Sequence, residues 1–231
     1  MVFFVTRGFP QKSYNPVFAE NEWSAIIEAC HANEVPDEWV ADGTCYKDML
    51  INGTNYRIDI IGKNHDDLAD GTGKAPLTFQ LHDCYATTYP MNPTNTNVGG
   101  WTNCAMRTTH LPAILNMMPA EVKAAIRDVQ KKSSAGNQSR SIQTTNDKLF
   151  LLSEIEIFGS TTYSFAGEGT QYDYYKAGNS KVKNLSGSAN AWWERSPRSS
   201  SSANFCIVNS SGSAGANTAR GSRGVAFGFC F

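Results

Sequence analysis

The segment AWWERSPRSSSSANFCIVNSSGSAGANTARGSRGVAFGFCF, residues Ala191 to Phe231, combines two opposite kinds of sequence. Large aromatic residues gather at its two ends, whereas Ser, Ala, Gly, Asn, Thr and Arg dominate the stretch from Arg198 to Arg223. The runs FCIVN and GVAFGFCF predict short strands, and in the second run the alternate residues from Val225 to Phe231 share one face. We therefore expect buried aromatic strands at both ends of the segment and exposed small residues between them.

The first part of the chain predicts a helix, a hairpin and a strand. Within Pro16–Cys30 apolar residues recur at helical spacing, and Asn21 is the expected N-cap. Apolar runs on both sides of Asn52-Gly53 predict a β-hairpin over Cys45–Asn64, because this dipeptide favours a two-residue turn. A further strand is expected within Ala75–Thr87, where apolar and polar residues alternate.

The middle of the chain predicts helices followed by irregular structure. Trp101–Met118 is expected to be helical with a boundary at Pro112, and Met118–Ser133 is expected to form one amphipathic helix. Ser134–Asp147 is polar enough to be a loop, and Lys148–Ser160 is apolar enough to be a buried strand. This order predicts the α+β class, with early helices packed on a small antiparallel sheet and with long irregular loops.

Composition and charge exclude several classes of protein. With 231 residues and 41% hydrophobic residues the chain can bury a real core, unlike a disordered protein. Its net charge of -1 gives no basis for binding nucleic acid or anionic lipid. No apolar run approaches the roughly 20 residues of a membrane-spanning helix, so we expect no membrane insertion. The start MVFFVTRGFP lacks the features of a signal peptide, and we expect synthesis in the cytoplasm without classical export.

The cysteines and the acidic loop near His65 give little support for a metal site. The six cysteines are widely spread without a CxxC pair, which indicates buried thiols rather than a disulfide scaffold or a zinc site. The loop NHDDLADGTGK, Asn64 to Lys74, contains hard ligands for a divalent ion, but it lacks the EF-hand spacing. Solubility and local turn formation explain such residues more simply, so we expect no metal.

Candidate catalytic pairs are similarly weak. Cys104 and His110 lie six residues apart, a helical spacing that places them on different faces. Glu154 and Glu156 have the spacing of a strand, which would point both carboxylates to one side, as in a hydrolase or on a strand with one wet face. Neither pair makes a convincing enzyme, and we expect none.

Four motifs occur together in the second half of the chain: KLFLLSEIEIFG (Lys148–Gly159), WWERSP (Trp192–Pro197), NFCIVNSSGS (Asn204–Ser213) and GVAFGFCF (Gly224–Phe231). With these motifs the chain resembles a family of uncharacterised domains found in bacterial and gut-phage proteins. The resemblance covers most of the chain and is densest in its second half. It implies a C-type-lectin-like fold, related to that of formylglycine-generating enzymes, in a single domain over residues 1–231.

Several members of this family are variable proteins of diversity-generating retroelements, whose C-terminal region is rewritten by mutagenic reverse transcription. Asn codons with randomised adenines cannot yield Lys, Glu, Gln, Met or Trp, and every residue from Arg198 to Arg223 belongs to the remaining set. An ordinary Ser/Gly loop passes the same test fairly often, so the flanking motifs carry more weight. The resemblance implies an N-terminal arm over residues 1–20 and a hypervariable ligand-binding region over residues 186–231.

Side chains on loops over a rigid scaffold can change while the fold survives. The expected ligand-binding positions are therefore those that point outward within the hypervariable region. For Ile207 a place in the core of the FCIV strand is an equal alternative. The positions are Arg198, Ser200, Ser202, Ala203, Asn204, Ile207, Asn209, Ser211, Ala214, Ala216, Asn217, Thr218, Arg220 and Arg223.

The resemblance also implies partners and a location. We expect a non-catalytic receptor-binding protein at the tip of a bacteriophage tail fibre, assembled into the virion within the bacterial host cytoplasm. Its expected partners are a host-cell surface receptor, either a protein or a glycan, and virion tail proteins, which are commonly homotrimeric.

Two alternatives remain, namely an enzyme on the same fold and a structural virion component. The enzyme would be carbohydrate-active or a formylglycine-generating-like oxidase. Such an oxidase uses copper and a closely spaced cysteine pair, whereas Cys206 and Cys230 are far apart in the sequence and lie in separate predicted strands. We therefore expect no cofactor.

Overall fold

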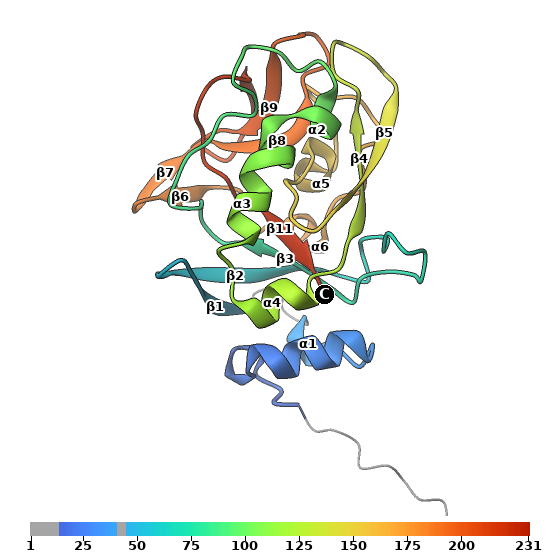
Figure 1. Ribbon diagram of the computed structural model, residues 1–231, viewed down its shortest axis with the longest axis vertical. Coiled ribbons are helices and arrows are strands. Elements are labelled where there is room, and N and C mark those ends of the chain that lie inside the picture. Colours follow the sequence, from blue (N-terminus) through green and yellow to red (C-terminus); the bar gives the residue numbers. More distant parts are fainter. Residues whose placement is uncertain (1–13, 41–44) are drawn as a thin grey trace, which may run out of the picture.

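A four-stranded antiparallel sheet crosses the middle of the protein (Figure 1). The computed structural model describes residues 14–40 and 45–231, so most of the expected N-terminal arm lies outside the described residues. Asn52 and Gly53 have positive φ angles of 48° and 78° and form the turn between the first two strands, which confirms the predicted hairpin. The strands, in spatial order, are β1 (Tyr46–Ile51), β2 (Thr54–Lys63), β3 (Leu77–Leu81) and β11 (Gly228–Cys230).

The predicted N-terminal helix packs on this sheet as α1 (Trp23–His31), beside α4 (Ala120–Ala125). The Trp23 ring meets the rings of Phe79 and Phe231 edge-on, with centroids 5.9 and 6.1 Å apart. The prediction of Asn21 as the N-cap is wrong, because the helix begins after Glu22. The side-chain amide of Asn21 instead donates to the carbonyls of Asn15 and Val17. Two short 3₁₀ turns flank the helix, η1 (Phe18–Glu20) and η2 (Asp37–Trp39).

A second antiparallel sheet lies at the far end of the molecule from α1 (Figure 1). Its strands are β8 (Trp192–Pro197), β9 (Asn204–Val208) and β10 (Ala214–Thr218), in the order β10-β9-β8, so β10 is an edge strand. Three short helical segments occupy the region Trp101–Met118 that was predicted to be helical. Pro112 lies in the first turn of the third segment, as expected. The segments are α2 (Gly100–Asn103), the π-helical turn η3 (Met106–His110) and α3 (Leu111–Leu115).

The long amphipathic helix predicted over Met118–Ser133 is wrong in its second half. The helix α4 ends at Ala125, and a strand, β4 (Val129–Ser134), follows. This strand pairs with β5 (Ile142–Asp147), within the stretch that was expected to be a polar loop. Val129, Lys131 and Ser133 occupy every second position of β4, and their side chains are buried. This two-residue period is that of a strand and not of a helix, and pairing with β5 stabilises the strand.

The buried strand predicted over Lys148–Ser160 is also wrong, because a helix, α5 (Glu154–Phe158), occupies its second half. The Ser153 hydroxyl accepts from the Glu156 amide, and the Glu156 carboxylate accepts from the Ser153 amide, which makes a capping box. The region that follows is mostly irregular and contains three short elements, namely α6 (Asp173–Lys176), β6 (Lys183–Leu185) and β7 (Ser188–Asn190).

The C-terminal segment divides as its composition predicts. Every residue of Trp192–Pro197 and of Gly224–Phe231 is buried. Between these two framework stretches only Phe205–Val208, Gly215 and Ala219 are buried. The mixed α+β class with small antiparallel sheets is thereby confirmed. Over residues 14–40 and 45–231 no helix has the length and apolar character needed to cross a membrane.

Candidate ligand-binding surface

The predicted ligand-binding residues lie on the β9–β10 hairpin and the loops at its ends. We call the parts of Arg198–Arg223 that reach solvent the C-terminal surface. Ile207 is only 3% exposed and packs in the core, so the expectation that it points outward is wrong. The other expected positions reach solvent at least in part, and they are Arg198, Ser200, Ser202, Ala203, Asn204, Asn209, Ser211, Ala214, Ala216, Asn217, Thr218, Arg220 and Arg223.

The structure brings one group of these residues together at one end of the hairpin. Asn204 lies directly opposite Thr218 in the β9–β10 register. The Arg198 Nε donates to the Ser200 Oγ at 3.1 Å, and its guanidinium lies over the Tyr163 ring, 5.4 Å from the centroid. This end of the surface is therefore continuous across the 198–204 loop and β10.

A second group lies around the turn at the other end of the hairpin. The Asn209 amide donates to the Ser213 Oγ at 3.2 Å and to the Ala214 carbonyl at 3.1 Å, which braces the turn. Five paired residues separate the two ends, a span of about 15 Å at the usual rise of a strand. One ligand that contacts both groups must therefore be large.

Asn97 anchors the 198–204 loop through its backbone. This residue is fully buried, and its Nδ2 donates to the carbonyls of Ser201 and Asn204, both at 2.7 Å. Its own backbone amide donates to the Ser202 carbonyl, also at 2.7 Å. None of these bonds uses a loop side chain, so loop side chains can change without loss of the anchor.

The rest of the C-terminal surface is attached in the same way. The Asn92 amide donates to the Ala219 carbonyl at 3.0 Å, and Tyr89 and Arg223 exchange two backbone hydrogen bonds of 3.2 Å. The Ser199 amide donates to the Tyr163 carbonyl at 2.7 Å. These supporting roles could not be predicted from the sequence, since the stretch before Trp101 shows only the Asn- and Pro-rich composition of a loop.

The electrostatic character of the surface is positive. Arg198, Arg220 and Arg223 reach solvent, and no Asp or Glu occurs between Arg195 and Phe231. The supporting stretch from Cys84 to Ala120 contains no acidic residue either. Such a surface suits an acidic or strongly polar ligand.

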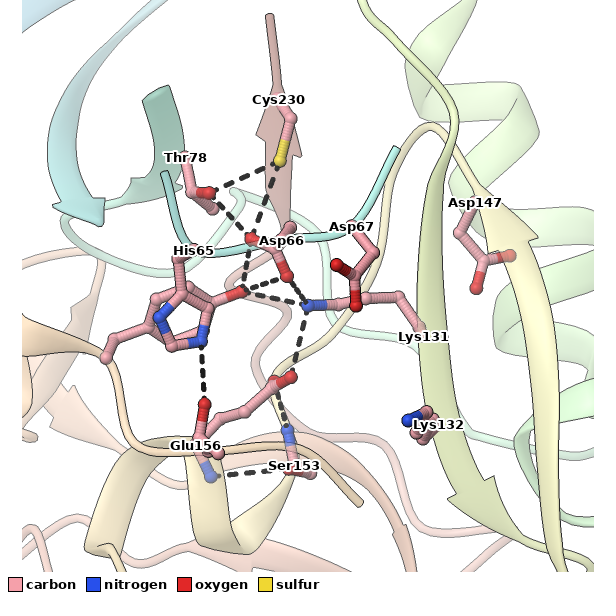
Figure 2. A network of polar contacts seen from close by, with 12 residues as sticks. His65, Asp66, Asp67, Thr78, Lys131, Lys132, Asp147, Ser153, Glu156 and Cys230 are labelled. Carbon is pink, nitrogen blue, oxygen red and sulfur yellow. Dashed lines mark hydrogen bonds and ion pairs between the residues drawn. The ribbon is translucent and has the colours of Figure 1, made fainter. Parts of the chain in front are cut away.

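Asp66, Lys131, Glu156 and Arg195 form a buried ion cluster (Figure 2 shows the first three). The Lys131 Nζ lies 2.6 Å from Asp66 Oδ1 and 3.1 Å from Glu156 Oε1. The Tyr172 hydroxyl also donates to Asp66. Burial alone would raise the pKa of Asp66, but Lys131 outweighs it and lowers that pKa to about 2.

Arg195 ties this cluster to the strand that leads into the C-terminal surface. Its guanidinium forms two bonds to the Glu156 carboxylate and donates to three backbone carbonyls, those of Lys132, Leu151 and Glu168. Five donors therefore have five acceptors. A fully satisfied buried network of this kind rigidifies the structure around it.

Two further carboxyl groups are buried next to Arg195. Glu168 accepts from the Ser134 amide at 2.7 Å and from the Ser196 hydroxyl, and burial raises its pKa to about 7. Glu194 is fully buried, and neither of its oxygens has a hydrogen-bond partner within the described ranges. Burial, with the nearby Glu154 and Glu168, raises the pKa of Glu194 well above its usual value.

The acidic loop near His65 is paired with cations of the protein itself. Asp66 belongs to the ion cluster, Asp67 lies 2.7 Å from the Lys74 Nζ, and Asp70 lies 2.6 Å from an Arg127 Nη. Within the part of the chain that the structure describes, no three His, Cys, Asp or Glu side chains are grouped so that they could hold a metal ion.

The candidate catalytic pairs are not assembled for chemistry. Glu154 and Glu156 lie on a helix rather than a strand, which corrects the expected spacing, and both are buried. Glu154 accepts from the amides of Tyr163 and Ser164, whereas Glu156 serves the ion cluster. The Cys104 thiol donates to the Trp101 carbonyl, and burial raises its pKa to about 12.

The two cysteines relevant to an oxidase lie in different sheets. Cys206 is in β9 and Cys230 is in β11, and both are fully buried. Burial raises the pKa of each thiol well above its usual value, so neither is a thiolate at neutral pH.

No curated protein and no solved structure matches this chain. One family matches residues 77–230, from β3 to β11, and it is described as a domain of unknown function, DUF6273. The match covers most of the chain and includes the buried ion cluster from Lys131 onward and the whole C-terminal surface. The protein therefore belongs to the DUF6273 family.

Proposed function

We propose that this protein is a non-catalytic receptor-binding protein that displays a diversified C-terminal surface on a C-type-lectin-like scaffold. The observation that carries the proposal is the way the surface is held. Its loops are anchored by hydrogen bonds to their backbone, above all from Asn97, and buried framework strands flank them on both sides. Side chains between these anchors can change with little effect on stability.

The proposal names the setting as a bacteriophage tail and the source of variation as a diversity-generating retroelement. Its expected ligand is a protein or glycan receptor on the surface of the host cell. Positive charge from Arg198, Arg220 and Arg223 favours an acidic receptor. The two separated groups of the surface favour a large ligand over a small molecule.

The genetic part of the proposal is tested in the genome from which the chain comes. We expect a reverse-transcriptase gene beside a near-copy of the 3′ end of this gene, with the two copies differing at adenines. If neither is present, the protein is not diversified in this way, and only a fixed binding protein remains.

The binding part is tested with three single variants, Arg198→Ala, Asn217→Ala and Arg223→Ala, and with Lys132→Ala as a control outside the surface. We expect the three variants to alter binding to host cells while their melting temperatures stay close to that of the unmodified protein. The control is expected to bind as the unmodified protein does. If the three variants instead dissociate an oligomer, the surface is a subunit contact of a structural virion component.

A further inference from the structure

A polar pocket of about 280 Å³ lies away from the C-terminal surface, between β2, the residues after β3 and the β6–β7 turn. Arg57, His82, Asp83 and Asn184 line it. The proposed receptor binding uses none of these residues, since all of them lie outside Arg198–Arg223. The pocket is therefore a separate candidate for a ligand.

A buried carboxylate holds two basic side chains at the wall of this pocket. The side chain of Asp59 is 4% exposed; its Oδ1 accepts from Arg57 Nε at 2.8 Å, and its Oδ2 lies 2.6 Å from His82 Nδ1. The backbone supports the same arrangement, since the His82 amide donates to the Arg57 carbonyl at 2.9 Å. Burial alone would raise the pKa of Asp59, but the hydrogen bonds from His82 and Arg57 outweigh it and lower that pKa.

These contacts leave the Arg57 Nη donors unused, and they leave His82 Nε2 able to donate when the imidazole is protonated. Within residues 14–40 and 45–231 no protein group accepts a hydrogen bond from the Arg57 Nη atoms, and none forms a hydrogen bond with His82 Nε2. The Arg57 and His82 side chains are 35% and 37% exposed, so ligands can reach both. Arg57 is further ordered by the Tyr46 ring, whose centroid lies 3.7 Å from its guanidinium carbon.

The larger pocket next to the ion cluster, of about 320 Å³, differs in this respect. Arg195 lines it, but all five of its donors already have protein acceptors. The guanidinium that lines that pocket is fully bonded within the protein, whereas the Arg57 guanidinium keeps Nη donors that have no acceptor among the described residues. An ordered guanidinium edge beside a protonated imidazole is suited to an oxyanion, because the two groups can then each donate to one oxygen.

We propose that the pocket at Arg57 and His82 binds a small hydroxylated acid through its carboxylate or phosphate group. Asp83 defines the other side of the pocket, where its Oδ1 accepts from the Asn184 amide at 2.7 Å and from Asn184 Nδ2 at 3.2 Å. Its Oδ2 can accept from ligand hydroxyl groups, and its charge repels a second anionic group. The acid group is therefore directed to Arg57 and His82, and the hydroxyl groups to Asp83.

The test measures binding to the full chain by NMR titration at low ionic strength, with glucuronate, glucose 6-phosphate and glucose as probes. The first two share the acid and differ in its source, and glucose lacks it. We expect at least one acid to bind and to shift the His82 ring signals, and glucose to bind far more weakly. If the folded protein binds neither acid, or binds glucose equally well, the proposal is overturned.

Two variants locate the binding. We expect Arg57→Gln and His82→Gln each to weaken binding of the acid about tenfold or more, since each removes a hydrogen bond to a charged group. Lys132→Gln is the matched control, because it removes one positive charge from an exposed site outside the pocket, and its affinity should stay within about twofold. Melting temperatures show whether each variant is folded. An acid that binds folded Arg57→Gln as tightly as the unmodified protein contradicts the assignment.

Discussion

The buried ion cluster and the C-terminal surface are held together in different ways, although Arg195 of the cluster lies only three positions before Arg198 of the surface. In the ion cluster, side chains bond to side chains, as Arg195 and Lys131 do to Glu156. In the C-terminal surface, the bonds from Asn97 run to backbone carbonyls, and side-chain bonds such as those of Asn209 at the turn are local. Residue identity therefore determines the first region and is less constrained in the second. Substitutions on either side of Pro197 can show how sharply these two regions are divided.

The largest difference is expected between two arginines three positions apart, Arg195 and Arg198. Arg195→Met leaves the Glu156 carboxylate and three backbone carbonyls short of donors in the protein interior. We expect it to lower the free energy of unfolding by about 3–5 kcal/mol. Arg198→Met removes a partly exposed side chain, and its expected effect is within about 0.5 kcal/mol.

Urea denaturation of the two variants measures both values. Similar losses of stability in both variants would show that the boundary between scaffold and surface does not lie at Pro197. A loss confined to Arg195→Met would place the boundary within three residues.

An intermediate effect is expected for Asn97, which joins the scaffold to the surface. Asn97→Ala removes the donors to Ser201 and Asn204 and the acceptor of the Asn137 amide. We expect a loss of about 1–3 kcal/mol, because buried polar groups lose their partners. Hydrogen exchange should also become faster at the amides of the 198–204 loop.

Asn95→Ala is the matched control, since the Asn95 side chain makes one exposed contact, a 3.2 Å bond from the Arg220 amide. Its expected cost is about 0.5 kcal/mol or less. Equal costs for the two asparagines would mean that backbone anchoring is not what holds the loop.

The last expected effect depends on pH and concerns Glu194, whose carboxyl group has no hydrogen-bond partner among residues 14–40 and 45–231. Its pKa in the folded protein lies above the value of about 4.3 in the unfolded chain. The native state therefore keeps a proton that the unfolded state releases, and stability falls as the pH rises above about 4.3. Glu168, with a pKa of about 7, adds to the same decline up to neutral pH.

Glu194→Gln removes the titrating group, so the free energy of unfolding should fall less between pH 5 and pH 8. The difference between the two proteins should widen steadily as the pH rises from 5 to 8, because the unfolded state of the unmodified protein releases the Glu194 proton more readily than the native state does. The two proteins should differ least below pH 4. Parallel pH profiles would show that Glu194 is ionised in the folded protein.

Sequence patterns predicted the features that depend on a few neighbouring residues. The Asn52-Gly53 turn formed as expected, because its chemistry is local. The buried ends of the C-terminal segment also followed from composition, since aromatic residues seek the core. The capping box at Ser153 and Glu156 is also a local feature. Its Ser-x-x-Glu pattern is typical of a helix N-terminus and contradicts the strand predicted there.

The predictions that failed concern features that depend on residues distant in the sequence. Val122, Ile126 and Val129 fit one helical stripe, but pairing with β5 makes Val129 the start of a strand. Lys131 looks like a surface residue in the sequence, yet it is 1% exposed because Asp66, 65 positions away, and Glu156, 25 positions away, compensate its charge. The sequence gives no signal for such long-range pairs. For the same reason Asn97 could not be recognised as an anchor.

The position of β11 after the C-terminal surface in the chain has a consequence for inherited variation. β11 lies beside β3 and pairs with it (Figure 1). It contributes Phe229 to the core, where its ring stacks on that of Phe79. A premature stop or a shifted reading frame within Arg198–Arg223 would remove or scramble this strand, leave β3 unpaired on one side and open the core. A product with altered side chains on the C-terminal surface can therefore still fold, whereas a truncated or frameshifted product does not reach the native state.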